Sequence, residues 1–425
     1  TETGRYVEVP QEAMRARAWR FVEGLPYVRR PHPTRSDPDP TPQRAVMRAG
    51  KKAVDEVLEG ASAWRQGPSS LPTWWPRRLE VDPSPDRLLA LGNGLLDTET
   101  MEMMPPTRRF ITRNASPVSY VRNAPDPEGW LRFLDEIFEG DQEQIDCLEE
   151  VIGLVLTQDV SFQKIFVLVG PRRSGKGTVL RTVQEMVGEG NHCSVSAKSM
   201  ADDFGLQPLI GKQLAVMSDF RLHGRSPAAM VENLLRISGA DEVTVNRKHR
   251  DAWQGRLSAR FLMASNELMA LHDASGAVVS RLIVMRTKAS FYGQEDKTLF
   301  ERVIRPELPG ILNRCLRALV RLRARGHFLQ PSSSAADIET MEAVASPVKA
   351  FARKWLRQEQ GALTPKDEVY MAFNDFLAEE GLSYSPEKAR FFRDLAAADI
   401  RFKEERPHMN GERVRCLRGV RLIED

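Results

Sequence analysis

Continuous apolar runs recur between amphipathic segments in the middle of the chain. The runs cover residues 165–169, 211–219, 260–265 and 282–285. Runs of this length are typical of strands that are buried on both faces of a parallel sheet. Helical periodicity follows the first two of them, at 179–187 and 227–237. The pattern therefore predicts an α/β fold over residues 161–330, with a parallel sheet flanked by helices.

The first 85 residues have a weaker pattern. Residues 11–25 and 43–66 show helical periodicity, and a proline-rich stretch at 31–42 separates them. Proline fixes the backbone angle φ and lacks an N–H donor, so this stretch cannot form a helix or a central strand. We therefore expect residues 1–85 to be a helical N-terminal region with a proline-rich linker.

A short apolar segment precedes the predicted sheet domain. Residues 88–97 resemble a small hairpin that turns at Asn93-Gly94, a dipeptide that favours tight turns. Residues 127–157 have the periodicity of two helices and lead directly into the first apolar run. We expect residues 86–160 to form a small α+β or helical collar domain.

The C-terminal part of the chain begins after a serine-rich break at 331–336 and is basic. Its pattern predicts helices at 348–357, 366–380 and 386–396, followed by two short strands around Asn410. Three helices followed by a hairpin suggest a winged-helix-like domain over residues 345–425. Whether such a domain contacts DNA or only packs on the sheet domain stays open.

The most specific motif follows the first apolar run. Residues 170–176 read Gly-Pro-Arg-Arg-Ser-Gly-Lys and fit G-x-x-x-x-G-K, the phosphate-binding loop. The glycines let backbone N–H groups surround phosphate oxygens, and the N-terminus of the next helix adds positive potential. A glycine-rich turn without a ligand is the alternative. We predict that a nucleotide binds here, to Gly170, Ser174, Gly175, Lys176, Gly177 and Thr178.

The end of this loop departs from the common pattern. Gly177 stands where a serine or threonine usually binds Mg²⁺, and the hydroxyl comes one residue later, at Thr178. The Gly-Lys-Gly-Thr ending is similar to that of adenylate-kinase-type loops. Thr178 is therefore a candidate metal ligand, either directly or through water.

Polar residues also follow the second and third apolar runs. Asp219 ends the second run, and Asn266 follows the third. Because the carboxyl ends of parallel strands share one edge of a sheet, we expect Lys176, Asp219 and Asn266 to converge there. Asp219 can bind Mg²⁺, and Asn266 can orient the attacking water or contact the γ-phosphate.

Basic residues cluster just before the third run. Arg247, Lys248, His249 and Arg250 lie within a stretch that also contains Arg256, Arg260, Trp253 and a single acid, Asp251. Such a basic hairpin with an aromatic residue can bind a phosphate backbone and a base. The alternative is a solvated charged turn. The arginine-rich helix at 308–325 is more simply a solvated face than a DNA site.

Composition excludes several other classes of protein. The chain has 425 residues, which corresponds to about three domains, and its net charge is only +3, so a nucleic-acid site must be a local feature. Four scattered cysteines, with no C-x-x-C spacing, indicate reduced thiols rather than disulfides or zinc. No membrane-spanning stretch or signal peptide is visible, so we expect a cytoplasmic protein without a membrane partner. The start at Thr1 is consistent with a processed or excised fragment.

Together these residues resemble the superfamily 3 helicases of the AAA+ class, and within them the phage and plasmid primase–helicases related to the poxvirus uncoating-factor type. The similarity covers residues 85–425. Further stretches that look like the family are Asn93 to Asp97, Gly211-Lys212, Ser238 to Asp241 and Ser265 to Glu267. One departure is Ser218-Asp219, where many relatives have Glu or two adjacent acids.

The resemblance implies an ATP-dependent DNA helicase for replication of a phage, satellite or plasmid in a bacterial host cell. It implies a ring, as a hexamer, with ATP and Mg²⁺ at each subunit boundary, single-stranded or forked DNA in the pore, and a primase or polymerase as a domain or partner. Lys248-His249 would match the pore hairpin of the family. Arg281 would reach the neighbouring subunit's ATP site, although an internal salt bridge is the alternative for it, and Arg286 is a second candidate.

Two rivals remain open. The Gly-Lys-Gly-Thr ending also suggests a P-loop small-molecule kinase, which would explain neither Asn266 nor the basic hairpin. A non-unwinding AAA+ module that loads another helicase or marks an origin would share the nucleotide site.

Overall fold

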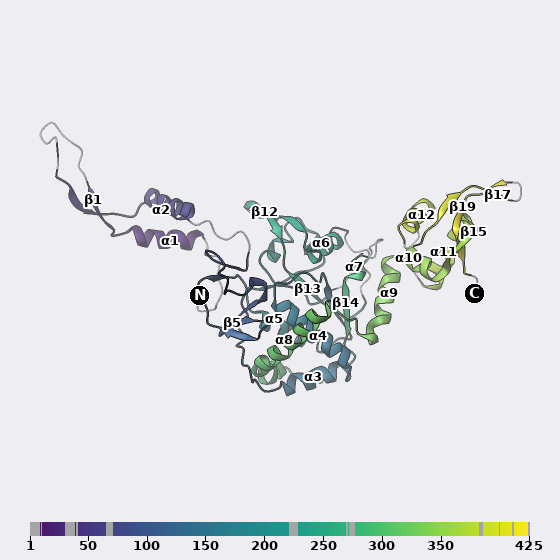
Figure 1. Cartoon of the computed structure of the whole chain (residues 1–425), viewed down its shortest axis with the longest axis horizontal. Helices are drawn as coiled ribbons and strands as arrows, with labels where there is room; N and C mark the ends of the chain where they lie inside the picture. Colours follow the sequence, from purple (N-terminus) through teal and green to yellow (C-terminus); the bar gives the residue numbers. More distant parts are fainter. Residues whose placement is uncertain are drawn as a thin grey trace. The chain divides into compact units, whose positions relative to one another are not determined.

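The computed structural model (Figure 1) describes residues 9, 11–29, 39, 41–64, 71–220, 228–268, 271, 277–381, 386–398, 400–409 and 412–423. It divides into two compact units. The first comprises residues 1–85 and 107–113, and the second comprises residues 86–106 and 114–425. In the described part of the chain, no helix is long and apolar enough to cross a membrane.

The described residues of the first unit form two helices and two small antiparallel sheets. Its elements are α1 (Gln11–Val22), β1 (Pro26–Arg29), β2 (Gln43–Val46), α2 (Lys51–Trp64), β3 (Thr73–Trp74) and β7 (Phe110–Ile111). The helix expected from residue 43 begins only at Lys51, because residues 43–46 pair with β1 as a strand. Most of the proline-rich stretch lies outside the described residues.

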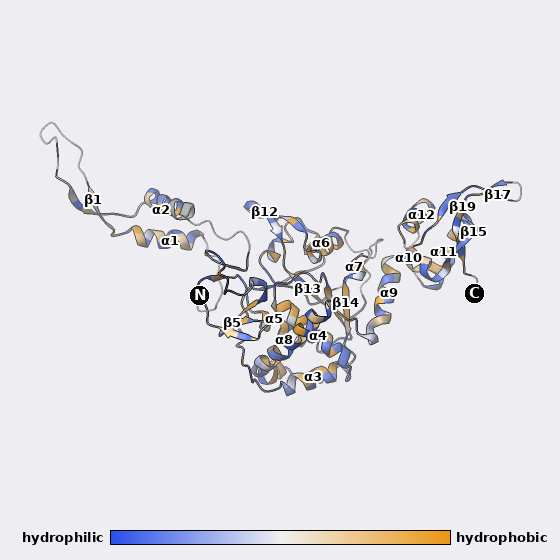
Figure 2. Cartoon of the chain, in the orientation of Figure 1, coloured by the Kyte–Doolittle hydropathy of each residue, from blue (hydrophilic) through white to orange (hydrophobic). Residues whose placement is uncertain are grey.

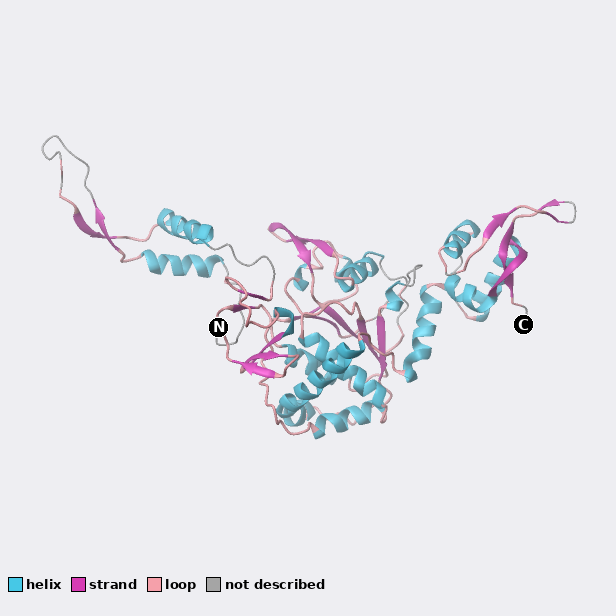
Figure 3. Ribbon diagram, viewed as in Figure 1, coloured by secondary structure: helices cyan, strands magenta, loops and turns pink. Residues whose placement is uncertain are grey.

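A five-stranded parallel sheet forms the centre of the second unit (Figure 3). The strand order is β14-β8-β13-β10-β9. The strands are β8 (Ile165–Val169), β9 (His192–Ser194), β10 (Leu214–Met217), β13 (Arg260–Ser265) and β14 (Leu282–Arg286). The four predicted strands are all present. The sequence did not indicate β9, because its three residues, His-Cys-Ser, do not form an apolar run.

Helices cover both faces of this sheet. The side chains of β8 point alternately to the two faces, and each set packs against a different group of helices. Phe166 and Leu168 share one hydrophobic core with α3 (Glu128–Phe138), α4 (Gln142–Leu156), α5 (Lys176–Val187) and α8 (Leu308–Arg325). The other core contains residues from α6 (Ala228–Ser238), α7 (Ala277–Ser280) and α9 (Ala335–Ala345). Figure 2 shows the hydrophobic colouring concentrated where α4, α5 and α8 pack. Residues from 86–106 and 114–160 thus share a core with the sheet.

The predicted hairpin at 88–97 is present, as β4 (Leu88–Leu91) and β5 (Gly94–Asp97), with β6 (Glu102–Met104) added beside it. Its turn is Gly92-Asn93, one residue earlier than expected. The Asn93 side chain accepts a hydrogen bond from the Tyr120 N–H and donates one to the Tyr120 carbonyl, each over 2.9 Å. These two bonds hold Asn93 within the turn.

The C-terminal part has its own hydrophobic core, which includes Phe351, Phe373 and Phe391. The helices are α10 (Pro347–Trp355), α11 (Lys366–Glu379) and α12 (Lys388–Ala396). The strands are β15 (Leu356–Pro365), β16 (Lys403–Glu405), β17 (His408–Met409), β18 (Glu412–Arg413) and β19 (Cys416–Leu422). The sequence predicted the helices and the β17–β18 pair but missed the three-stranded sheet β15-β19-β16.

Candidate functional site

The G-x-x-x-x-G-K segment forms the connection between β8 and α5, because β8 ends at Val169 and α5 begins at Lys176. Gly175 has φ +86, a value that disfavours any other residue, and it is the N-cap of α5. A Cβ atom at Gly170 would lie 1.9 Å from Oγ1 of Thr287, so only glycine fits there. The two glycines therefore allow the loop to run close to Thr287 and to lead directly into the N-terminus of α5, where the helix dipole is positive.

Lys176 folds back onto its own loop. Its ammonium donates hydrogen bonds to the carbonyls of Gly170 and Pro171, each over 2.7 Å, and to Ser174 Oγ over 3.2 Å. An ammonium has three hydrogens, so these bonds use all of them. Burial lowers the pKa of Lys176, and the negative charge of Asp219 opposes this. An anion beside the ammonium would favour the protonated, charged form of Lys176, which burial disfavours.

A cavity of about 490 Å³ contains the residues expected to converge. It is lined by Lys176, Asp219 and Asn266, together with loop residues 172–177 and Ser218. The cause is the strand order, since β13 lies between β8 and β10 and all three run in the same direction. Ser265, at the end of β13, donates a hydrogen bond to the Phe220 carbonyl over 3.0 Å, which joins the segments that carry Asn266 and Asp219.

Thr178 is not among the residues that line this cavity. It lines a neighbouring cavity of about 570 Å³, together with Gly177 and residues of α3 and of the segment 291–303. Asp219 is therefore the carboxylate that lines the loop cavity, and Thr178 does not line it with Asp219. In the described residues, no group of three or more His, Cys, Asp or Glu side chains is placed to hold a metal ion. A single carboxylate fits Mg²⁺, which keeps several waters and takes phosphate oxygens as further ligands.

Sequence reasoning missed the 570 Å³ cavity. Its walls include Phe133 on α3 and Phe291, and it adjoins the phosphate loop through Arg173, Gly175 and Gly177. The Arg181 guanidinium lies over the Phe300 ring, 4.0 Å from its centre. Phe300 begins a π-helical turn over residues 300–304. Residues 291–297 have no regular periodicity, so the only signal was their position after the last strand.

Arg281 is not brought to either cavity. Its carbonyl accepts a hydrogen bond from the Ile165 N–H, so it lies where the parallel strands begin, at the opposite edge from the loop. Its guanidinium donates hydrogen bonds to the Leu235 carbonyl and to Ser238 Oγ, at the end of α6. The second candidate, Arg286, makes two hydrogen bonds of 2.6 Å with the Asp337 carboxylate on α9.

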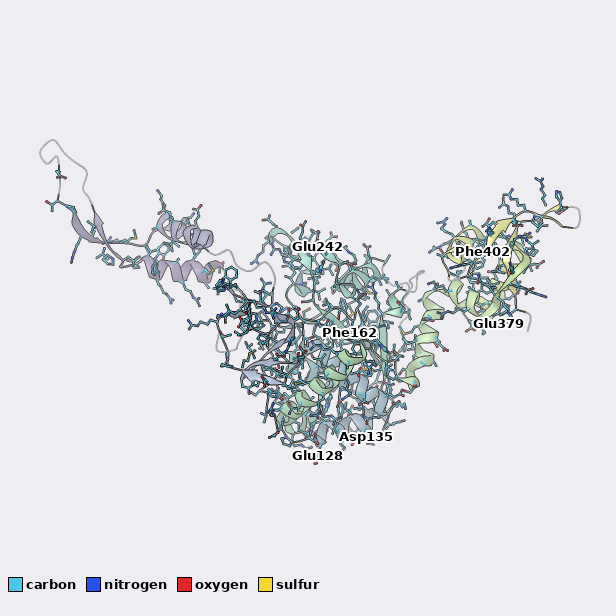
Figure 4. All side chains as sticks on the ribbon, viewed as in Figure 1. Glu128, Asp135, Phe162, Glu242, Glu379 and Phe402 are labelled. Carbon is cyan, nitrogen blue, oxygen red and sulfur yellow. The ribbon has the colours of Figure 1, made fainter. Side chains whose placement is uncertain are left out.

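The basic cluster lies on a β-hairpin of β11 (Glu242–Arg247) and β12 (Arg250–Arg256). Val243 and Val245 are buried and anchor its base, whereas Lys248, His249 and Arg250 are exposed around the turn. The Arg247 side chain donates a hydrogen bond to the Asp251 carbonyl over 2.8 Å. Figure 4 labels Glu242, the first residue of β11, and shows the side chains that project from this hairpin.

The arginines of α8 form a solvated face only in part: Arg317 and Arg321 are exposed, as expected, whereas Arg314 and Arg325 are half-buried. Arg314 forms an ion pair with Glu149, and Arg325 forms one with Glu150, each over 2.5 Å. Both glutamates are buried on α4 and need a partner cation. These arginines therefore bind α8 to α4.

Comparisons with known proteins give similarity over parts of the chain. Residues 168–281, from β8 to Arg281, match a family of unknown function (DUF5906). Residues 45–139 match a family described as D5 N terminal like. Among solved structures, the A form apo structure of the NrS-1 C terminal region has a TM-score of 0.49 and 12% sequence identity, over 89% of this chain and 92% of that chain. A second apo structure of that region has a TM-score of 0.46, also at 12% identity over 89% and 92% of the two chains. The chain is thus similar to these families within the ranges given, and to the NrS-1 C terminal region.

Proposed function

We propose that this protein is an ATP-driven DNA helicase motor of the superfamily 3, AAA+ type, which acts in the replication of a phage, satellite or plasmid. The convergence of Lys176, Asp219 and Asn266 in one cavity at the carboxyl edge of the sheet carries this proposal. The similarity of residues 45–139 to the D5 N terminal like family agrees with it.

The triphosphate would bind in the 490 Å³ cavity, against the loop N–H groups and the N-terminus of α5. Lys176 would exchange at least one loop carbonyl for a phosphate oxygen. Asp219 would hold Mg²⁺ together with phosphate oxygens and water, and the metal would neutralise charge on the phosphates. Asn266 would orient the attacking water by hydrogen bonding. Thr178 lines the neighbouring cavity and not this one, which favours its acting through water or on the nucleotide rather than as a direct metal ligand.

The base and ribose would occupy the neighbouring 570 Å³ cavity, which has aromatic walls and shares loop residues with the phosphate cavity. Such continuity supports a nucleotide rather than a free phosphate as the ligand.

The hairpin β11–β12 would contact the DNA backbone through Arg247, Lys248, His249 and Arg250, because phosphate contacts are made by exposed, clustered cations. A ring of subunits, as a hexamer, would bring several such hairpins to one strand of DNA. For Arg281 to reach a neighbouring subunit's ATP site, its guanidinium would have to leave the end of α6. The three C-terminal helices with the β17–β18 hairpin are consistent with a winged helix.

One experiment separates this proposal from its rivals. ATP hydrolysis would be measured with and without single-stranded DNA, and strand displacement would be measured on a forked duplex. A helicase should show both DNA-stimulated hydrolysis and ATP-dependent displacement. Hydrolysis without displacement would favour a loading or origin-marking ATPase, and phosphate transfer to a small molecule without DNA stimulation would favour a kinase.

A further inference from the structure

Thr287 lies against the phosphate loop although it belongs to a different part of the sequence. It is the first residue after β14, and it is 1% exposed. Its N–H donates a hydrogen bond to the Val169 carbonyl, at the end of β8, over 2.8 Å. Its hydroxyl is 2.7 Å from Ser174 Oγ and 3.3 Å from the same Val169 carbonyl. The side chain therefore joins the loop to the strand from which it emerges.

The directions of these hydrogen bonds are set at both ends, because the Lys176 ammonium can only donate and the Val169 carbonyl can only accept. Lys176 can only donate, so Ser174 Oγ accepts its bond of 3.2 Å. The Ser174 proton is then available for Thr287 Oγ1, and the Thr287 proton for the Val169 carbonyl. Each hydroxyl accepts once and donates once. The chain runs in one direction, from the ammonium of Lys176 to the backbone of β8.

We propose that Thr287 is a positioning residue for the nucleotide site, and that it fixes the Lys176 ammonium through Ser174. The inference rests on the proposed function of the loop as an ATP site. Without the Thr287 hydroxyl, the buried Ser174 hydroxyl loses its acceptor and must turn towards another one. We expect it to compete for the Gly170 and Pro171 carbonyls that hold Lys176, so that the lysine loses its defined position.

The test uses two substitutions that differ by one group. Thr287→Val keeps the branched shape and the backbone bond to Val169 but removes the hydroxyl, whereas Thr287→Ser keeps the hydroxyl. We expect Thr287→Val to bind ATP and ADP about tenfold more weakly than the wild type, the scale of one buried hydrogen bond. Thr287→Ser should restore most of the affinity. Binding of AMP should change little, since Lys176 acts on the β- and γ-phosphates.

A matched control is Thr364→Val. Thr364 is also buried, and its hydroxyl also donates to a carbonyl, that of Val420, over 2.7 Å, but it lies in the C-terminal part. It should lose thermal stability as Thr287→Val does, without losing affinity for ATP.

Ser174→Ala tests the same bond from the other side and does not depend on how Thr287→Val folds. In the relay, Ser174→Ala weakens ATP binding at least as much as Thr287→Val, and the double variant is no weaker than Ser174→Ala alone. Additive losses, an unchanged affinity in Ser174→Ala, equal losses for AMP and ATP, or a Thr287→Ser variant as weak as Thr287→Val would overturn the positioning role. A wild-type protein that binds no ATP would overturn the proposed function and the relay together.

Discussion

At the scale of the residue, the candidate site combines groups that already satisfy one another. The ammonium of Lys176 is occupied by its loop, and Ser174 and Thr287 continue the same hydrogen-bond chain. Asp219 is exposed at the rim of the cavity and influences Lys176 through its charge. Removal of one of these groups should therefore disturb the others and lower ATP binding or hydrolysis.

The first prediction concerns Asp219. Asp219→Asn keeps the size of the side chain but removes the charge that would hold Mg²⁺. We expect ATP to bind, while hydrolysis falls about 100-fold or more, the scale for loss of one electrostatic stabiliser of the transition state. Equilibrium binding and steady-state hydrolysis would be measured together. Asp203→Asn, at an exposed position away from the cavity, is the control, and hydrolysis at the wild-type rate in Asp219→Asn would exclude the metal role.

The second prediction concerns Gly177, where a substitution should strengthen Mg²⁺ binding. Nothing lies within 4 Å of a Cβ atom at this position, so Gly177→Ser should fold without strain. It places a hydroxyl where other phosphate loops bind Mg²⁺. We expect the Mg²⁺ concentration for half-maximal hydrolysis to fall several-fold, and the thermal midpoint to rise slightly because serine favours a helix over glycine. Gly177→Ala should raise the thermal midpoint as Gly177→Ser does, but it should leave the Mg²⁺ dependence as in the wild type. The same Mg²⁺ dependence in both variants would argue against a metal beside residue 177.

At the scale of the element, continuous apolar runs were sufficient to predict β8, β10, β13 and β14, because strands buried on both faces contain few polar residues. Because these strands are parallel, their carboxyl ends lie at one edge of the sheet, and the convergence of Lys176, Asp219 and Asn266 could be expected from the sequence. Other parts were not predictable from local pattern. Thr287 reaches the loop only because β14 pairs with β8, and Gln43 to Val46 become a strand only because β1 lies beside them.

The basic hairpin should be needed for DNA rather than for ATP. Replacement of Lys248 and His249 together by alanine leaves the buried anchors Val243 and Val245 in place. We expect basal hydrolysis to persist, while DNA stimulation and unwinding fall and the remaining DNA affinity depends less steeply on salt, since fewer phosphates are neutralised. The control is a double alanine variant at Lys51 and Lys52, both exposed on α2. An unchanged unwinding rate in the hairpin variant would assign it to ordinary surface.

The hairpin β4–β5 should carry a pH-dependent contribution to stability. Burial raises the pKa of Asp97, but the Glu99 N–H and the Arg87 guanidinium lower it by more in total, so that it lies below its ordinary value of 3.8. The stabilisation is therefore present above pH 3.8 and is lost as the pH falls through the lower, folded pKa.

Asp97→Asn should cost about 2 kcal/mol at neutral pH, because Arg87 loses a charged partner. It should also flatten the acid limb of the stability curve, as measured by denaturant unfolding at several pH values. Asp86→Asn, exposed on the same segment, should leave that limb unchanged. An acid limb of wild-type steepness in Asp97→Asn would assign the pH dependence to other carboxylates.

At the scale of the whole molecule, the proposed ring can be tested by mixing inactive subunits. Arg281→Ala should bind ATP but lose hydrolysis by about 1000-fold or more, the scale for a transition-state arginine supplied by a neighbour. Lys176→Ala should be inactive for a different reason, because its own loop cannot hold the phosphates. In a mixed ring, an intact loop can face an intact arginine, and some hydrolysis should return.

The matched control for Arg281→Ala is Ser238→Ala, which removes one partner of the guanidinium but keeps the cation. It should keep hydrolysis. The two inactive variants, Arg281→Ala and Lys176→Ala, should regain hydrolysis when they co-assemble. If the mixtures stay inactive at all ratios, Arg281 has no catalytic role in a neighbouring subunit and only binds the end of α6.

The end of β14 has a mechanical consequence. Arg286 is bound to Asp337 on α9, and the next residue, Thr287, is bound to the phosphate loop. A displacement of α9 would thus be transmitted to the nucleotide site through the Arg286 side chain, one peptide unit and the Thr287 side chain. Conversely, a rearrangement of the phosphate loop on release of phosphate would shift the position of α9. The end of β14 would then couple the nucleotide site to α9, the helix that precedes the C-terminal part.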